Sequence, residues 1–336
     1  MNGPVMFDTL DDAACDAGGA LDRAAQPNLF DRLDWFRLLR DHDADLGMPL
    51  VIRSGEGAAR AWLFLAREGG GARAFANCYT HKTGVVRANC ATPQASVDAL
   101  VTGLRESSIS QLTLAPTAAD DPLFDALRGQ GWLARRGPIS RQWRITTSGL
   151  SFDRYWAARP SRLRNTVRRR AKAAGLKLVV LDRFDDAAWD DYRAVYAQSW
   201  KPGEDREEVL DALVRQEGEA GTLRLGLAYQ GARAVAGQIW LTEGGHASIH
   251  KLAHDEDARD LSPGAILSAE MFRHALDVDR VEAIDFGIGD DGYKAEWMDE
   301  SVPLMSVTAF DVRRPGGIAA AGRAAASKLV ARVHRR

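Results

Sequence analysis

The sequence predicts a mixed α/β protein built from two related domains, and three observations lead to this prediction. The chain has 336 residues, more than one average domain needs and a comfortable length for two. Hydrophobic residues make up 46% of it and charged residues 27%, as in soluble globular proteins. The order meander, helix, strand, helix, strand occurs twice along the chain. We therefore expect mixed α/β (α+β) sheets in one domain at 1–148 and another at 149–314, followed by a basic tail at 315–336.

In the first half, apolar residues at helical spacing predict a helix over 28–42, where Asn28 or Asp31 is available as a cap. Glycine-rich turns then separate the short strands of a meander. The predicted ranges are strands 49–53, 61–66 and 72–78, helix 95–106, strand 111–115, helix 122–130 and strand region 132–146.

The second half repeats this order without sequence identity to the first. The dipeptides Gln230-Gly231 and Gly244-Gly245 mark the turns of its meander. The predicted ranges are helices 151–158 and 161–174, strand 176–181, helices 185–199 and 204–217, strands 223–229, 235–241 and 247–252, helix 265–278, strand 281–286, short helix 293–297 and strand 304–312.

The most informative segment is a polar loop between a strand that ends near Ala253 and a helix opened by Ser262-Pro263-Gly264. The start of a helix leaves backbone N–H groups unpaired, and its dipole favours negative charge. Such a layout suits a phosphate or pyrophosphate. The alternative is an ordinary Ser-capped helix, because Ser-Pro before a helix is common.

A second unusual segment, 281–294, predicts a buried strand that ends on Asp285 and a glycine-rich turn that presents Tyr293 and Lys294. A carboxylate at a strand end lies at the edge of the sheet, where the ligand sites of α/β proteins gather. Lys294 is expected to pair with Asp285 or to hold an anionic substrate. The alternative is a structural Asp–Lys ion pair beside a packed tyrosine.

His250 lies in the strand that precedes the polar loop, and alternation puts Ser248, His250 and Leu252 on one face. A histidine is suited to deprotonating an ammonium group near neutral pH. A structural role for His250 is the alternative. The other candidate bases are Glu243, His246 and His254.

These segments together resemble the GNAT superfamily of acyltransferases, whose pyrophosphate loop has the form Arg/Gln-x-x-Gly-x-Gly/Ala. Arg259 to Gly264 matches this form, with Ser262 where the first glycine is usual. The chain is more specifically similar to the CelD-like acetyltransferases in one combination of motifs. This combination is Ser-Pro-Gly, then an amphipathic helix, then Asp-Phe-Gly-x-Gly-x-x-x-Tyr-Lys. That family is related to the Fem-type aminoacyltransferases of peptidoglycan synthesis. The resemblance covers about 151–312.

The resemblance implies tandem GNAT-like domains, with the acyl-CoA site in the C-terminal one and acetyl-CoA as co-substrate. The loop would bind the pyrophosphate, and the preceding strand would pair with the pantetheine and present an N–H group to the thioester oxygen. The implied cofactor-binding residues are Leu252, Ala253, Arg259, Ser262, Gly264 and Ala265.

The resemblance also implies that Tyr293 protonates the leaving thiolate. The other predicted catalytic residues are Asp285 and His250, and the predicted substrate contacts are Asn165, Arg168 and Lys294.

The predicted function is transfer of an acetyl or other acyl group from acyl-CoA to an amine, or to a hydroxyl. The acceptor would be a small molecule or saccharide precursor in cell-envelope or polysaccharide metabolism. One alternative is a Fem-type transferase that uses aminoacyl-tRNA. The other is a non-catalytic GNAT-fold binding module.

The densest basic segment is 159–172, where Arg164, Arg168 and Lys172 form a row at i, i+4 spacing. Like charges so placed repel each other at a cost of about a few tenths of a kcal/mol per pair, so an anionic partner should offset them. An anionic acceptor, the CoA phosphates, the acidic segment 182–191 and RNA are the candidates. A plain solvated face is the alternative.

The formal net charge of −2 argues against a nucleic-acid partner, except for tRNA as the alternative donor. No apolar run approaches the roughly 20 residues that cross a bilayer, and the N-terminus lacks a signal pattern, so we expect a cytoplasmic protein. The basic tail is expected to be a loosely docked helix, with contact to a membrane surface as the alternative. The sequence does not specify an oligomeric state.

The cysteines Cys15, Cys78 and Cys90 are odd in number and scattered, so no disulfide framework is expected. Cys78 lies close before His81, but no second ligand pair accompanies them. The sequence therefore predicts no metal.

Overall fold

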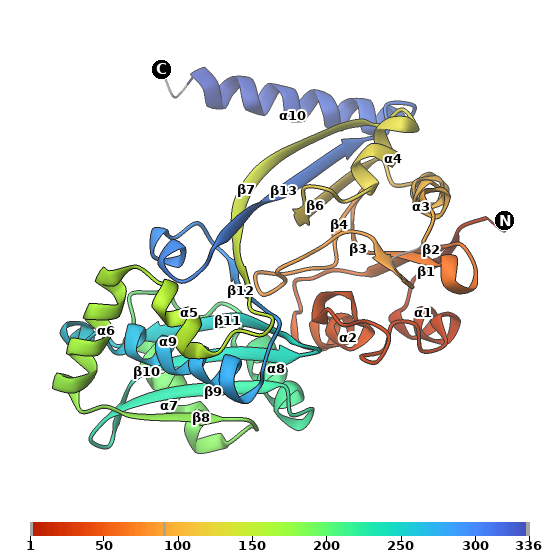
Figure 1. Cartoon of the computed structure of the whole chain (residues 1–336). Coiled ribbons are helices and arrows are strands. Elements are labelled where there is room, and N and C mark those ends of the chain that lie inside the picture. Colours follow the sequence, from red (N-terminus) through yellow and green to blue (C-terminus); the bar gives the residue numbers. More distant parts are fainter. Residues whose placement is uncertain (1–2, 90–91, 334–336) are drawn as a thin grey trace. The chain divides into compact units, whose positions relative to one another are not determined.

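The computed structural model describes residues 3–89 and 92–333, with side chains as far as 327 (Figure 1). Some of the positions considered in the sequence lie outside the described residues, namely Cys90, the side chains of Lys328 and Arg332, and residues 334–336. The chain divides into two compact units, Met1–Ser140 with Pro303–Arg336, and Arg141–Val302. The sequence puts the boundary at 148/149 and 303–314 in the second domain. The contacts place 303–314 in the first unit, because residues 304–310 pair with 111–118.

The first unit is a mixed sheet with helices packed against it. Its elements are β1 (Val5–Phe7), α1 (Leu10–Ala17), η1 (Leu29–Asp31), α2 (Leu33–His42), β2 (Pro49–Ser54), η2 (Gly57–Ala59), β3 (Ala61–Glu68), β4 (Gly71–Ala74), β5 (Val86–Arg87), α3 (Gln94–Glu106), β6 (Gln111–Ala118), α4 (Leu123–Gly129), and α10 (Pro315–Val333). The strands β7 (Leu133–Thr146) and β13 (Glu300–Phe310) run from one unit into the other. The spatial order is β1, β2, β3, β4, β6, β13, and β5 pairs with β3. The helix α3 packs on β2 and β3 over an apolar core.

The second unit is also a mixed sheet covered by helices. Its elements are α5 (Phe152–Ala158), α6 (Ser161–Ala174), β8 (Lys177–Leu181), α7 (Asp186–Ala197), α8 (Glu207–Glu219), β9 (Leu223–Gln230), β10 (Arg233–Glu243), β11 (His246–His254), η3 (Glu256–Leu261), α9 (Pro263–Arg273), η4 (His274–Val278), β12 (Ala283–Ile288), and η5 (Gly292–Glu296). The spatial order is β7, β12, β11, β10, β9, β8. The pair β11 and β12 is parallel, and the other pairs are antiparallel.

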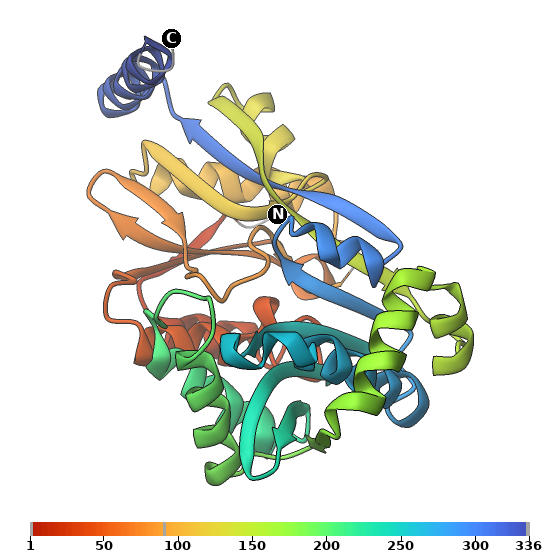
Figure 2. The same ribbon diagram turned by 90° about the vertical axis from the view of Figure 1, so that its left-hand side faces the viewer.

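Two helices of the second unit cover opposite faces of its sheet. Gly237 and Gln238 are neighbours in β10, so their side-chain positions point to opposite faces. A Cβ atom on Gly237 would lie 2.6 Å from Tyr192 of α7, whereas the Gln238 amide donates a 2.7 Å hydrogen bond to Ser268 of α9. The helix α7 therefore packs on one face and α9 on the other (Figure 1 and Figure 2).

Local signals explain several helix ends. The side chain of Asp185 accepts a hydrogen bond from the N–H of Ala188 and caps α7. Gly175 ends α6 in the left-handed conformation, which glycine adopts without a steric penalty.

The predicted mixed α/β fold is confirmed, and the differences concern particular elements. Over 28–42 the predicted single helix is wrong, because Arg32 is extended (ψ 147°) and separates η1 from α2. The buried Arg32 guanidinium donates hydrogen bonds to the carbonyls of Gln26 and Pro27, which ties this residue to the preceding loop. The helix predicted over 265–278 is α-helical to Arg273 and continues as the π-helical turn η4. The elements β1 and α1 were not predicted.

Candidate active site

The site begins where two parallel strands of the second unit separate. The register pairs His246–Ser248 of β11 with Ala283–Asp285 of β12, and within the described residues the pairing of these two strands extends no further. The later part of β11 keeps β10 on one side. Alternate backbone N–H and C=O groups of a strand point to opposite sides, so those on the side away from β10 face an opening.

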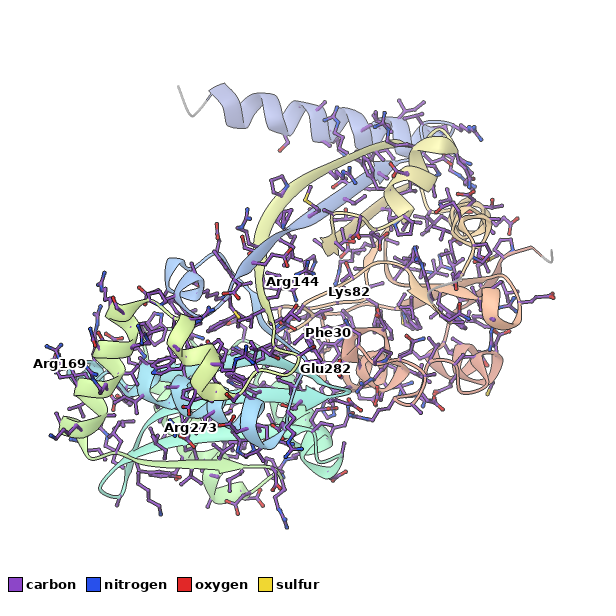
Figure 3. All side chains as sticks on the ribbon, viewed as in Figure 1. Phe30, Lys82, Arg144, Arg169, Arg273 and Glu282 are labelled. Carbon is purple, nitrogen blue, oxygen red and sulfur yellow. The ribbon has the colours of Figure 1, made fainter. Side chains whose placement is uncertain are left out.

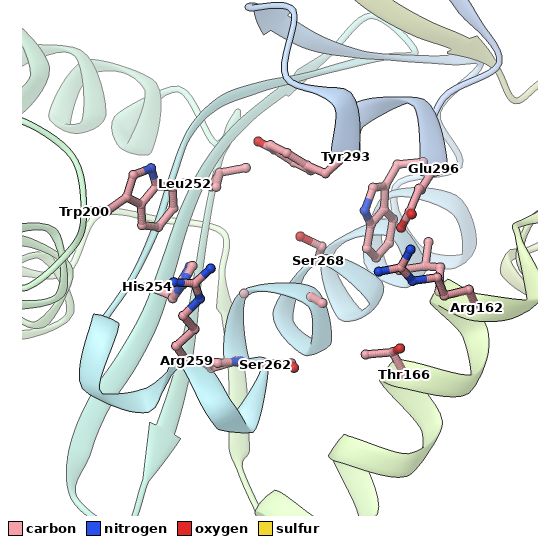
Figure 4. A pocket seen from close by; sticks show the side chains of 15 residues that line it. Arg162, Thr166, Trp200, Leu252, His254, Arg259, Ser262, Ser268, Tyr293 and Glu296 are labelled. Atoms are coloured by element: carbon pink, nitrogen blue, oxygen red, sulfur yellow. The ribbon is translucent and has the colours of Figure 1, made fainter.

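A pocket of about 510 Å³ lies at this opening (Figure 4). Leu252 and His254 line it from β11, and Tyr293 lines it from η5. Figure 4 shows Arg259 and Ser262 at one end and Arg162 with Glu296 on a further side. The lining residues are Arg162, Leu163, Thr166, Trp200, Leu252, His254, Arg259, Ser262, Pro263, Gly264, Ala265, Ser268, Tyr293, Glu296 and Trp297.

The predicted loop and helix start form one end of this pocket. The helix α9 begins at Pro263, which has no N–H group, and the Ser262 side chain makes no capping hydrogen bond. The alternative of an ordinary Ser-capped helix is therefore wrong. First-turn N–H groups, such as those of Gly264 and Ala265, have no partner within a helix and lie where the pocket is lined.

Ser262 adopts a backbone conformation that favours glycine, with φ 55° and ψ 45°. Any residue with a Cβ atom is strained there by about 1 kcal/mol. This strain gives a physical reason for the glycine that is usual at this position of the loop pattern.

We expect Ser262→Gly to raise the free energy of unfolding by about 0.5 kcal/mol. Relief of the strain stabilises the fold, and the larger freedom of glycine in the unfolded chain offsets part of the gain. Urea denaturation measures the change, and Ser262→Ala is the matched control, because it keeps the Cβ atom and should bring no gain. A loss of stability in Ser262→Gly would mean that the serine hydroxyl makes a stabilising contact.

A buried polar network holds the start of α9 against β10. The Gln238 amide donates hydrogen bonds to Ser268 Oγ (2.7 Å) and to the carbonyl oxygen of Gly264 (3.3 Å). Trp240 Nε1 donates to Gln238 Oε1 over 2.9 Å. Because these groups are buried, breaking the network would leave polar atoms unsatisfied, so the loop is held in one position.

Aromatic and ionisable side chains face the pocket. The rings of Trp200 and His254 lie 4.5 Å apart, and the ring of Tyr293 packs edge-on against Phe286 at 5.6 Å. Burial, helped by the charge of Arg259, lowers the pKa of His254, although Glu256 acts in the opposite direction. Burial, and then the charge of Asp291, raise the pKa of Tyr293 above its ordinary value. At neutral pH the imidazole is therefore a proton acceptor, and the phenol keeps its proton.

Asp285 lies outside the pocket lining and joins the two strands where they are still paired. Its carboxylate accepts hydrogen bonds from the Gly287 N–H (2.9 Å) and Ser248 Oγ (3.2 Å). His246 Nε2 lies 3.0 Å from the other carboxylate oxygen. Burial lowers the pKa of His246, but the hydrogen bond and charge of Asp285 outweigh it, and the pKa is raised.

Lys294 is buried, and the ion pair with Asp285, one of the two roles expected for it, is not among its contacts of ion-pair length within the described residues. Its Nζ donates hydrogen bonds to the carbonyls of Phe286, Ile288 and Gly289 at 3.0–3.4 Å, and Asp291 lies 3.5 Å away. The ammonium group thus holds the turn that carries Tyr293. The substrate contact expected of Lys294 stays a prediction, and the hydrogen bonds of its ammonium group in the structure are to carbonyls of the turn.

Four other predicted site residues, His250, Ala253, Asn165 and Arg168, also lie outside the lining. His250 and Ala253 are buried within β11. Arg168 donates a 2.9 Å hydrogen bond to the Asn165 side chain on the exposed side of α6, and Arg162 and Thr166 of that helix line the pocket instead. The pocket lining brings together the other residues that the sequence assigned to one site, namely Leu252, Arg259, Ser262, Gly264, Ala265 and Tyr293.

Sequence reasoning missed several lining residues, namely Arg162, Thr166, Trp200, Glu296 and Trp297. They come from α6, from the segment after α7, and from the end of η5 with the residue that follows it, and these segments are far apart in the chain. The sequence offered one signal for Trp200, which is a large aromatic residue directly before a Lys-Pro-Gly turn. In the structure its side chain is 49% exposed.

Over residues 3–89 and 92–333, no three His, Cys, Asp or Glu side chains gather closely enough to hold a metal ion. Within that same part of the chain, none of the helices combines the length and hydropathy that crossing a bilayer requires.

Comparison with known proteins finds a family that one segment of the chain matches. Residues 158–295 match the family described as "Acetyltransferase (GNAT) domain", and they include every lining residue except Glu296 and Trp297. No curated protein matched the chain.

Among solved structures, the chain is similar to FemX, with a TM-score of 0.64 at 12% identity, over 94% of this chain and 98% of that one. It is similar to L-PGS from Bacillus licheniformis, with a TM-score of 0.54 at 12% identity, over 93% and 98%. A tandem GNAT protein from the clavulanic acid biosynthesis pathway aligns with a TM-score of 0.52 at 13% identity, over 90% and 98%. At these identities the likeness is one of fold. The chain therefore has a GNAT fold with tandem-GNAT neighbours, and its residues 158–295 match the acetyltransferase (GNAT) domain family.

Proposed function

We propose that the second unit binds acyl-CoA in this pocket and transfers the acyl group, in the first place acetyl, to an amine. The observation that carries the proposal is the pocket at the separation of β11 from β12, closed at one end by the uncapped start of α9. A hydroxyl acceptor would use the same geometry.

The pocket offers groups for both ends of CoA. First-turn N–H groups of α9 suit the pyrophosphate, and the guanidinium groups of Arg259 and Arg162 supply positive charge nearby. The backbone groups on the side of β11 away from β10, near Leu252, suit the pantetheine amides, which would pair with them as an added strand does.

In the proposed reaction the neutral amine attacks the thioester carbon, a C–N bond forms, and the C–S bond breaks. A backbone N–H of β11 would stabilise the oxyanion. Tyr293 would donate its proton to the departing thiolate, and His254 is placed to take a proton from the amine. The predicted residues His250 and Asp285 would act by positioning β11 and β12, because both lie outside the lining.

Calorimetric titration with acetyl-CoA, followed by thiol release with a panel of amines, tests the proposal. We expect saturable binding and amine-dependent release of CoA. Binding without release under any amine would favour the non-catalytic GNAT-fold module, and absence of binding would refute the proposal. An acceptor from cell-envelope or polysaccharide metabolism, such as a saccharide precursor, is supported by the CelD-like pattern of the two segments alone.

A second candidate function uses aminoacyl-tRNA as the donor, and the charge of α6 is the observation that favours it. This helix has six basic residues and no acidic one, and none of the six forms an ion pair within the described residues (Figure 3, where Arg169 is labelled). Its basic residues are Arg162, Arg164, Arg168, Arg169, Arg170 and Lys172.

A variant without the exposed cations Arg168, Arg169 and Lys172 distinguishes acetyl-CoA from aminoacyl-tRNA as the donor. Arg164 is left unchanged because its Nε donates to the carbonyl of Arg159. We expect tRNA to bind with a dissociation constant of about 10⁻⁶ M or weaker at physiological salt, as in non-specific binding. The triple change of these cations to alanine should leave acetyl-CoA affinity within about twofold, because none lines the pocket. Submicromolar tRNA binding that the triple change abolishes would favour the tRNA-dependent reaction.

A further inference from the structure

A second pocket of the same unit lies beside the first. It has a volume of about 510 Å³ and is bounded by α7, the start of α8 and the segment between them. Trp200 connects the two pockets, because its ring contacts His254 of the first at 4.5 Å and lies 5.7 Å from Lys201 Nζ of the second. A ligand in the second pocket is thus a neighbour of the acyl-CoA pocket.

Lys201 brings a positive charge to this second pocket without a counter-charge of its own. Its Nζ lies 5.7 Å from the ring centroid of Trp200 and 6.0 Å from that of Tyr196, and it has no ion pair within the described residues. Aromatic faces attract an ammonium group, but they leave its N–H donors free for an anion.

The other charges of the pocket are already matched. Glu204 and Lys251 form a 2.6 Å ion pair with side chains only 14% and 16% exposed. Arg193 pairs with both Asp190 and Glu207 at the exposed rim, where water screens these charges. Lys201 is therefore the charge that a ligand can still neutralise.

Tyr192 adds a buried donor in the same lining. Its ring stacks on Trp189 at 5.0 Å, its side chain is 1% exposed, and its hydroxyl has no hydrogen-bond partner in the described chain. A buried hydroxyl without a partner is unfavourable, and an acceptor oxygen of a ligand would satisfy it.

We propose that this second pocket binds the carboxylate end of the acyl acceptor, with Lys201 pairing with the carboxylate and Tyr192 donating a hydrogen bond. The acceptor class is then a small molecule that carries an amine and a carboxylate. The inference rests on the proposed function for the amine, but binding of the carboxylate does not depend on CoA.

The proposal has a definite pH dependence. Burial, and then the charge of Lys251, lower the pKa of Lys201 to about 8, while Glu204 acts in the opposite direction. The more distant charges that act on it are Lys294 and Asp291. An anion stabilises the ammonium form, so it raises this pKa on binding. The affinity for the carboxylate is therefore greatest below pH 8 and declines as the pH rises above 8.

Binding without CoA tests the carboxylate site, with 3-phenylpropionate and its neutral counterpart 3-phenyl-1-propanol as probes in calorimetry. We expect the carboxylate to bind at least tenfold more tightly than the alcohol. Lys201→Met should remove this preference, and Lys201→Arg should keep it. Tyr192→Phe should weaken carboxylate binding severalfold without lowering Tm, because the lost hydroxyl has no hydrogen-bond partner among the described residues. Lys177→Met on the exposed start of β8 is the matched control and should change nothing.

Turnover then tests the link to the acyl-CoA pocket. A series of ω-amino acids is compared with the corresponding amino alcohols in the thiol-release assay, and the chain length with the highest kcat/KM reports the span between the sites. We expect each favoured amino acid to exceed its alcohol at least tenfold, and Lys201→Met to erase the difference.

The two proposals fail in different ways. Equal affinity for the carboxylate and the alcohol, or a preference that survives Lys201→Met with unchanged Tm, overturns the carboxylate site. If acetyl-CoA does not bind while the carboxylate probe still depends on Lys201, the proposed acyl transfer is wrong, and the second pocket stands as an anion site.

Discussion

Tyr293→Phe should lower kcat by about 10²-fold or more, with little change in KM for acetyl-CoA. The change removes one oxygen atom and keeps the ring that packs edge-on against Phe286. The phenol lines the pocket, and burial holds its pKa above the ordinary value, so it remains a proton donor throughout the neutral range. Without it the thiolate must leave unprotonated, which affects the transition state and not the binding of CoA.

Steady-state kinetics and calorimetry on the same preparation measure both quantities. The matched control is Tyr229→Phe, which also removes one phenol oxygen, here one that donates to Asp191 outside the pocket. Full activity in Tyr293→Phe would exclude it as the acid. Loss of acetyl-CoA affinity in step with kcat would mean that the residue holds the cofactor and does not act in the chemical step.

Gly264→Glu should weaken acetyl-CoA binding at least tenfold, about 1.4 kcal/mol. Gly264 is in the first turn of α9, and its missing side chain leaves the N–H groups of the turn open to the pocket. A Cβ atom there would lie 3.3 Å from His254 Nδ1, so a longer side chain must extend into the pocket. The glutamate charge would then occupy the place proposed for the pyrophosphate.

Two controls separate charge from packing. Gly264→Ala adds the Cβ atom alone and should weaken binding only slightly, because the backbone there is not left-handed. Gly129→Glu adds the same charge to α4, where nothing lies within 4 Å of an added Cβ atom, and should leave affinity unchanged. A folded Gly264→Glu protein with unaltered affinity would remove this loop from the proposed cofactor site.

The sequence by itself determined the fold class and the residues at the loop end of the candidate pocket, because both depend on local signals. Alternation and helical spacing place most strands and helices, and Ser262-Pro263-Gly264 marks the start of α9 in the chain. Leu252 and Arg259 lie close to this start along the chain, so local geometry is enough to bring them to one pocket.

Tertiary structure alone decided the remainder, because contacts between distant segments leave no periodic trace in the sequence. In the sequence, Asp285 at a strand end and Lys294 in the following turn suggest an ion pair. In the fold, Asp285 is held by Ser248 and Gly287, and Lys294 by carbonyls of its own turn. A charge that is buried away from water must be hydrogen-bonded inside the protein, and these partners satisfy both buried groups. Likewise the place of Trp200 in the pocket, where its ring contacts His254, depends on tertiary packing. Only the folded structure shows that the neighbouring Glu204 and Lys251 pair with each other, and that Lys201 has no ion pair within the described residues.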